Sequence, residues 1–149
     1  MNEIEIKMFQ LVNAGFCCTQ VMMKLALEEE EKENEDLIRA VGGLCKGIGG
    51  RQKTCGVLTG GIAIIGLYAG KGNVAEYPQS NYGSMVEDYI NWFEEVFKSL
   101  ECMDIIGVHN FTDHENNVYP LKCGDILVKS YVKLQEILKD YDYEYGCRE

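Results

Sequence analysis

Seven cysteines occur in this chain of 149 residues, and four of them lie where a helix is predicted to start or end. Cys18, Cys55 and Cys123 each lie at, or within one turn of, a predicted helix N-terminus, and Cys102 lies just past the end of another helix. The first turn of a helix offers unpaired N–H groups and a partial positive charge, which favour a thiolate over a thiol. A thiolate is both the nucleophile of disulfide exchange and a ligand for zinc or iron. These positions therefore predict redox chemistry or metal binding, without choosing between them.

A glycine-rich segment precedes Cys55 and predicts that the backbone comes close to a bound group. Residues 42–50 contain five glycines in nine positions, too many for a stable helix interior. Glycine lets the backbone approach a ligand and point its amides at sulfur or at an anion. We therefore expect Gly49, Gly50 and Gly56 to help bind a cofactor held by the cysteines.

The four cysteines can meet only through the fold, because 37, 47 and 21 positions separate them and no C-x-x-C occurs. Apolar residues recur at helical spacing and the chain has only two prolines, so the sequence predicts an all-α fold. We expect a bundle of five to six helices with a glycine-rich loop before the central helix. Asn34, Thr54 and Ser84 are the expected N-caps of three of them. The predicted helices cover residues 3–14, 18 to about 28, 35–41, 55–70, 85–100 and 122–139.

Composition and charge restrict the classes of function. With 149 residues, 46% of them hydrophobic, the chain can bury one core, so we predict a single domain over residues 1–149 with a loosely held tail at 140–149. A net charge of -10 repels phosphate backbones and anionic lipid, which argues against nucleic-acid binding and a membrane-surface role. The longest uncharged run, residues 54–70, is shorter than the ~20 residues that a membrane-spanning helix needs. It predicts a buried helix.

The N-terminal residues lack the basic start and unbroken apolar stretch of a secretory signal, so we expect a cytoplasmic protein. The cytosol keeps thiols reduced, and seven is an odd number of cysteines in a chain large enough to fold without cross-links. We therefore expect no disulfide framework. His109 and His114, in an irregular segment, are expected to be surface residues and not metal ligands.

Four features of the chain occur together in a known family. They are Gly15-Phe16-Cys17-Cys18-Thr19-Gln20-Val21, the glycine-rich segment with Cys55-Gly56-Val57-Leu58-Thr59-Gly60, the lone Cys102, and Pro120-Leu121-Lys122-Cys123. This set resembles the C_GCAxxG_C_C family of putative redox-active proteins, which are about this long and are defined by four cysteines. The resemblance extends from residue 15 to about residue 138. Val57 departs from the family pattern, where alanine is usual, and Cys17 departs from it, where asparagine is common.

The resemblance implies that Cys18, Cys55, Cys102 and Cys123 are the family cysteines, and it leaves Cys17, Cys45 and Cys147 without a role. A related domain is fused to haem-binding sequence in cytochromes that also carry an iron–sulfur centre. We therefore expect the four family cysteines to bind an iron–sulfur cluster, with zinc as the alternative metal, for electron transfer or redox sensing with a partner protein. The chain has no C-x-x-C-H, so covalently attached haem is not expected.

Two other functions stay open at this point. Two of the four cysteines could cycle between dithiol and disulfide without a metal, with Cys18 or Cys55 as the attacking thiolate of a thiol–disulfide oxidoreductase. The cysteines and small residues could instead only pack, in a helical bundle that binds a partner protein. A homo-oligomer is compatible with each function, and whether the protein is an enzyme also stays open.

Overall fold

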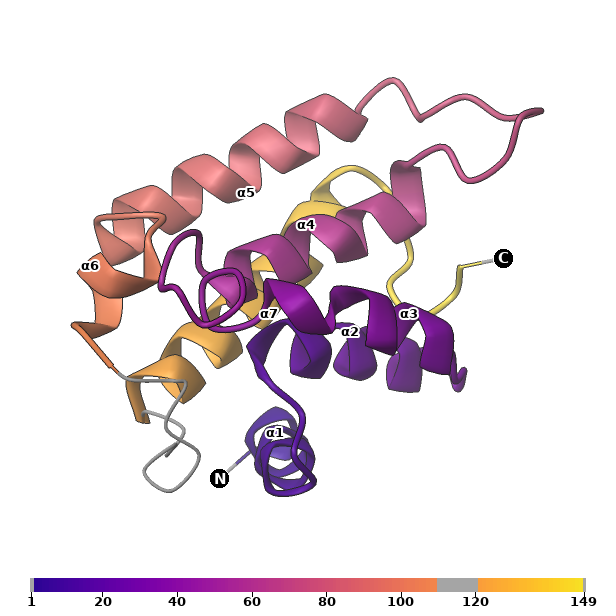
Figure 1. Cartoon of the computed structure of the whole chain (residues 1–149). Coiled ribbons are helices and arrows are strands. Elements are labelled where there is room, and N and C mark those ends of the chain that lie inside the picture. The colour runs from indigo at the N-terminus through magenta and orange to yellow at the C-terminus, as the bar shows by residue number, and fades with distance from the viewer. Residues whose placement is uncertain (1, 110–120, 149) are drawn as a thin grey trace.

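The computed structural model describes residues 2–109 and 121–148, which form seven α-helices and one 3-10 helix (Figure 1). The fold is all-α, as the spacing of apolar residues predicted. The described residues contain no strand and one isolated β-bridge. The helices are α1 (Glu3–Asn13), α2 (Cys18–Glu29), α3 (Glu35–Val41), η1 (Gly42–Leu44), α4 (Gly56–Ala69), α5 (Tyr82–Phe97), α6 (Cys102–Ile106) and α7 (Leu121–Asp140).

Side-chain caps explain where the first and third helices begin. The Asn2 side chain accepts a hydrogen bond from the Glu5 backbone N–H at 2.9 Å, and the Glu5 carboxylate accepts one from the Asn2 N–H in return. The Asn34 side chain accepts the Leu37 N–H at 3.0 Å, which confirms Asn34 as the predicted cap of α3. These caps satisfy N–H groups that have no partner inside the helix.

Two predicted caps are wrong. Cys55, not Thr54, is the N-cap of α4, because Thr54 instead forms the isolated antiparallel bridge with Glu101. Helix α5 begins at Tyr82, so Ser84 lies inside its first turn. The structure also contains α6, which takes the number of α-helices above the predicted five to six. Its five residues are too few to show a helical period in the sequence.

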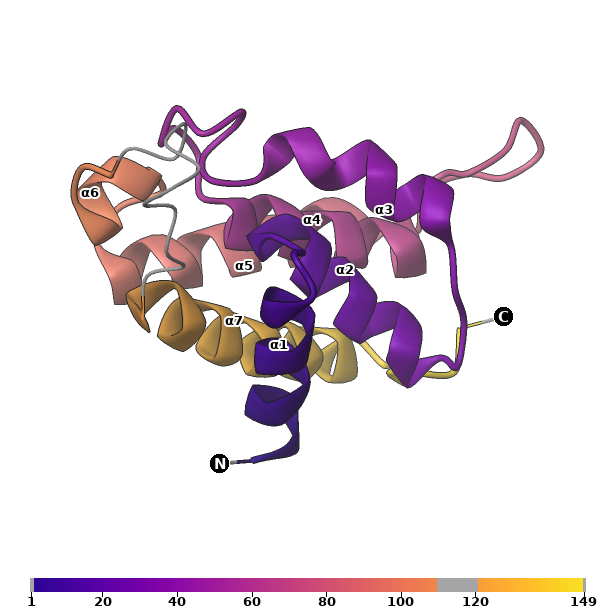
Figure 2. The same ribbon diagram turned by 60° about the horizontal axis from the view of Figure 1, so that its bottom comes forward.

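Helix α4 is the central helix and packs against α2, α5 and α7, as Figures 1 and 2 show. Its glycines permit these close contacts. A β-carbon at Gly60 would lie 2.9 Å from the Met22 Cβ of α2, and one at Gly61 would overlap the Tyr89 ring of α5. Met22 and Tyr89 are fully buried. None of the helices in the described ranges combines the length and apolar composition of a membrane span.

The C-terminal tail, which was expected to be loosely held, contacts the helices through aromatic and charged side chains. Tyr145 stacks on Tyr68 with ring centroids 5.7 Å apart, and its hydroxyl donates to the Tyr131 hydroxyl at 2.6 Å. Arg148 forms an ion pair with Glu30 at 3.2 Å. Buried aromatic area of this kind holds the tail against α2, α4 and α7.

Candidate functional site

The four family cysteines lie at the beginnings of four helices. Cys18 is the first residue of α2, Cys55 is the N-cap of α4, Cys102 is the first residue of α6 and Cys123 is the third residue of α7. In both views, α6 and the beginnings of α4 and α7 lie at the same end of the molecule (Figures 1 and 2). The prediction that these cysteines lie at helix ends is confirmed. Cys102 was expected just past the end of a helix, and it is the first residue of the next helix, α6.

The bridge between Thr54 and Glu101 brings two of these cysteines together. Around it the Cys55 N–H donates to Leu100 O at 2.8 Å, and the Cys102 N–H donates to Lys53 O at 2.7 Å. In an antiparallel pair with this register, Cys55 and Cys102 are diagonal neighbours on one face. The first turn of α6 therefore lies beside the first turn of α4.

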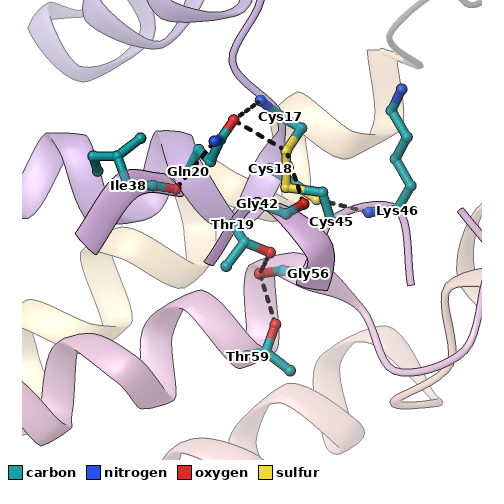
Figure 3. Close-up of a disulfide and its surroundings, with 10 residues drawn as sticks. All are labelled: Cys17, Cys18, Thr19, Gln20, Ile38, Gly42, Cys45, Lys46, Gly56 and Thr59. Carbon is teal, nitrogen blue, oxygen red and sulfur yellow. Dashed lines mark hydrogen bonds between the residues drawn. A yellow bond between two sulfur atoms is a disulfide. The ribbon is translucent and has the colours of Figure 1, made fainter. Parts of the chain in front are cut away.

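Gly56 brings the third cysteine into this group. A β-carbon at Gly56 would overlap both the Cys18 sulfur and the Thr19 hydroxyl oxygen. The Thr19 hydroxyl donates to Gly56 O at 2.9 Å, which joins the beginning of α2 to that of α4 (Figure 3). Only a residue without a side chain fits between the two helices at this position.

All four cysteines line one cavity of about 200 Å³. Cys18, Cys55 and Cys102 are buried, and Cys123 is half-buried. Most of the remaining wall is apolar, and Lys46 is the charged residue in it. The apolar wall consists of Val12, Phe16, Val57, Ile105, Ile106 and Ile126, and Gly15, Gly56 and Cys17 complete it.

Burial raises the pKa of all four thiols. The pKa of Cys55 rises to about 12, mainly because of burial and further because of negative charge on Cys18. The pKa of Cys123 also rises to about 12, from burial and then from the charges of the other three cysteines. The expected preference for thiolate at these helix beginnings is therefore wrong, because loss of water outweighs the partial charge of the N–H groups. Without a bound cation, the four sulfurs are thiols near neutral pH.

Two polar groups contact the sulfurs. The Lys46 backbone N–H donates to the Cys18 sulfur at 3.5 Å, and the Gln52 side-chain amide donates to the Cys102 sulfur at 3.7 Å. Gln52 is 3% exposed and is held by two further bonds, to Gly107 O at 2.7 Å and from the His109 backbone N–H at 2.8 Å. Sequence reasoning missed Gln52, whose only signal is its position as the uncharged residue between two basic ones before Cys55.

The glycines expected to contact a cofactor are only partly in place. Gly56 lines the cavity, but Gly49 and Gly50 do not. The Gly49 N–H donates to Gly43 O at 2.9 Å and the Gly50 N–H donates to Cys45 O at 3.4 Å, so both amides are used inside their own segment. Within that segment, the amide that reaches a sulfur belongs to Lys46.

The three remaining cysteines are not equivalent. Cys17 and Cys45 form a disulfide, with Cα atoms 5.9 Å apart, between the N-cap of α2 and the residue after η1 (Figure 3). A disulfide framework was not expected, and one bond is present because the fold brings these two positions within bonding range. Cys147 is free and exposed.

Metal-binding geometry for a single ion is not present in the described part of the chain, where no group of three or more Cys, His, Asp or Glu side chains could hold an ion. The imidazole Nε2 of His109 lies 3.0 Å from Ile106 O, and His109 does not line the cavity. His114 lies outside the described residues.

Comparison with known proteins identifies a matching family. The family described as "Putative redox-active protein (C_GCAxxG_C_C)" matches residues 16–137, a range that includes the four cysteines of the cavity. No curated protein and no solved structure matches the chain. Because the family match extends over well more than half of the chain, the protein belongs to the C_GCAxxG_C_C family of putative redox-active proteins.

Proposed function

We propose that the protein is an electron carrier or redox sensor that holds an iron–sulfur cluster on Cys18, Cys55, Cys102 and Cys123. One observation carries the proposal: four cysteines from four separate helices line a single, largely apolar cavity. Four cysteines are the usual ligand set of such a cluster, and the cluster would supply reversible one-electron chemistry.

The raised pKa values of the thiols fit metal binding better than disulfide exchange by the same residues. Burial raises the pKa of Cys123 to about 12, and negative charge on the other three cysteines adds to the shift. Coordination to a metal cation deprotonates a thiol and compensates its charge. A thiol–disulfide oxidoreductase instead needs a thiolate near neutral pH, so Cys18 and Cys55 are poor candidates for an attacking nucleophile.

The size of the cavity favours a cluster over zinc. One water molecule needs about 10–15 Å³ of such space, and this cavity offers about 200 Å³. A structural zinc site closes four sulfurs around one ion at about 2.3 Å, which leaves little room between them. A cluster separates its ligands by its own width, and thus suits four cysteines that line a cavity of this size.

The residues around the sulfurs would set the properties of the site. The Lys46 N–H and the Gln52 amide already donate to the sulfurs of Cys18 and Cys102, and such bonds stabilise the more negative state of a cluster. The apolar wall, including Ile105 and Ile126, limits access of water. Cytoplasmic location, a redox partner protein and a homo-oligomer belong to the same proposal.

The test is metal and sulfide analysis of protein purified without oxygen. Iron and acid-labile sulfide in equal stoichiometric amounts, with a brown colour and visible absorption that bleaches on reduction, would support the proposal. A colourless protein with one zinc per chain would replace the cluster by a structural metal site. Protein without metal or sulfide, also after reconstitution with iron and sulfide, would contradict metal binding altogether.

A further inference from the structure

We propose that Cys17 and Cys45 form a second redox site, a reversible disulfide–dithiol couple that a dithiol reductant opens by attack on the Cys17 sulfur. Neither residue belongs to the four family cysteines. Their Cα atoms are 5.9 Å apart, within the range of about 4.4–6.8 Å that a disulfide requires, so the bond can form and re-form without movement of the backbone.

The two residues differ in exposure, from which we infer where a reductant attacks. Cys45 is 5% exposed and belongs to the buried core, whereas Cys17 is half-buried and lines the wall of the cysteine cavity. Thiol–disulfide exchange requires a thiolate to reach one sulfur in line with the bond that breaks. Cys17 is therefore the sulfur that an incoming thiolate reaches, and Cys45 is the leaving group.

The reaction balances with a dithiol as the reductant. Its thiolate attacks the Cys17 sulfur, the Cys17–Cys45 bond breaks, and Cys45 leaves as a thiolate that takes up a proton. The second thiol of the reductant, as a thiolate, then attacks the reductant sulfur that is bonded to Cys17. The Cys17 sulfur leaves as a thiolate and is protonated. Two electrons and, in sum, two protons pass from the dithiol to the protein, and the reductant becomes a disulfide.

The surroundings of Cys17 accommodate the dithiol state. Gln20 Oε1 lies 3.4 Å from the Cys17 sulfur and Gly42 O lies 3.9 Å from it, so acceptors for a Cys17 S–H are close by once the two sulfurs separate (Figure 3). The Gln20 side chain is held in place, because its amide donates to Ile38 O at 3.1 Å and its oxygen accepts the Cys17 N–H at 3.3 Å.

The residues that follow Cys17 and Cys45 in the chain connect the disulfide to the cysteine cavity. Cys18 follows Cys17 and Lys46 follows Cys45, and the Lys46 N–H donates to the Cys18 sulfur at 3.5 Å. Opening the disulfide removes the covalent link between Cys17 and Cys45, which holds Cys18 and Lys46 close to each other. The oxidation state of Cys17 and Cys45 thus acts on a contact of the proposed cluster site.

The first experiment is a redox titration of the full-length protein in buffers of reduced and oxidised dithiothreitol. Samples are quenched with acid, alkylated and read by mass spectrometry, with fragment ions that distinguish Cys17 from the adjacent Cys18. Cys147→Ser is the background, since it removes the exposed thiol and with it intermolecular disulfides. We expect Cys17 and Cys45 to become labelled together in one two-electron transition that reverses on reoxidation.

Three results would overturn the proposal: a pair that stays closed in excess reduced dithiothreitol under native conditions, a pair that is labelled at every ratio, or Cys17 joined to another cysteine. The readout is the label on each individual residue, with Cys17 separated from the adjacent Cys18 by fragment ions, so it is independent of metal content. Failure here leaves the iron–sulfur proposal standing, and the reverse also holds.

The second experiment tests the direction of attack with two single variants in the same Cys147→Ser background. Cys45→Ser leaves Cys17 as a thiol, and Cys17→Ser leaves Cys45. We expect the Cys17 thiol to react with an aromatic disulfide probe at least tenfold faster, again read at the peptide. Equal rates, or faster reaction of Cys45, would overturn the assignment of Cys17 as the attacked sulfur. If either variant does not fold, the titration of the intact pair decides the proposal alone.

Discussion

Gly56 lies against Cys18 so closely that a β-carbon on Gly56 would overlap the Cys18 sulfur. The contact joins the first turn of α2 to the first turn of α4, and thereby places Cys18 beside Cys55. This contact explains why the family pattern has a glycine directly after Cys55, since a side chain at Gly56 would collide with the Cys18 sulfur.

Gly56→Ala is expected to displace the Cys18 sulfur or separate the two helices. Overpacking of this kind costs about 1–3 kcal/mol, so the free energy of unfolding should fall by that amount in a urea titration. Gly83→Ala is the matched control, because Gly83 lies in α5 with no atom within 4 Å of an added β-carbon. The control should be unchanged or slightly more stable. Equal stability of the two variants would show that the α2–α4 contact is looser than described.

A second prediction concerns pH. The pKa of Cys55 and that of Cys123 rise from 9.0 to about 12 on folding, so the folded metal-free protein binds more protons than the unfolded chain between these values. The stabilisation is fully present below about pH 9 and is lost as the pH rises toward 12. The free energy of unfolding of the metal-free protein should thus fall between pH 8.5 and 10, as urea titrations at the two pH values would measure.

Cys55→Ala should weaken this pH dependence, since one buried thiol no longer titrates. Tyr89 and Tyr131 also have a raised pKa because of burial, but their ordinary value is 10.0, so their contribution begins at higher pH. Stability that is constant or rises over this pH interval would contradict burial of the four thiols.

The packed tail gives a third prediction. Tyr145→Ala removes a ring that contacts both Tyr68 and Tyr131, so we expect a loss of about 2–3 kcal/mol in the free energy of unfolding. Tyr77→Ala makes the same substitution on a side chain that is 84% exposed, and it should change stability by less than about 0.5 kcal/mol. Similar values for the two variants would mean that the tail does not contribute to folding.

The sequence predicted the parts of the fold that local chemistry determines. Asn34 caps α3 because its short side chain reaches the Leu37 N–H, a local interaction that the residue types already indicate. The start of α4 could not be predicted in this way. Thr54 pairs with Glu101, which is 47 positions away, and this bridge leaves Cys55 as the cap.

The sequence grouped the four cysteines that line the cavity, but it did not predict the electrostatics of their surroundings. The family pattern identified the four cysteines, but a helix beginning predicts a low pKa only where water still reaches the sulfur. Here burial dominates, as the raised pKa of Cys55 shows. The roles of Lys46 and Gln52 depend on how residues 45–55 turn. Lys46, Ile48 and Gln52 have positive φ there, a conformation that non-glycine residues rarely adopt and that the sequence does not reveal.

The disulfide gives a fourth prediction. It closes a loop with a sequence separation of 28, for which the loss of chain entropy in the unfolded state corresponds to about 3–4 kcal/mol. The double variant Cys17→Ser/Cys45→Ser should lose stability of this order relative to the oxidised protein in urea titrations without reductant. Cys147→Ser should not. A double variant as stable as the oxidised protein would contradict the bond between Cys17 and Cys45.

The proposed cluster site requires that four cysteines hold one cofactor together. The iron and sulfide content of the seven single Cys→Ser variants, prepared without oxygen, tests this most directly. Substitution of Cys18, Cys55, Cys102 or Cys123 is predicted to remove most of the iron, the sulfide and the visible absorption. Cys17→Ser, Cys45→Ser and Cys147→Ser are predicted to retain the cofactor. Full cofactor content in any variant of the first group, or complete loss in Cys147→Ser, would contradict the assignment.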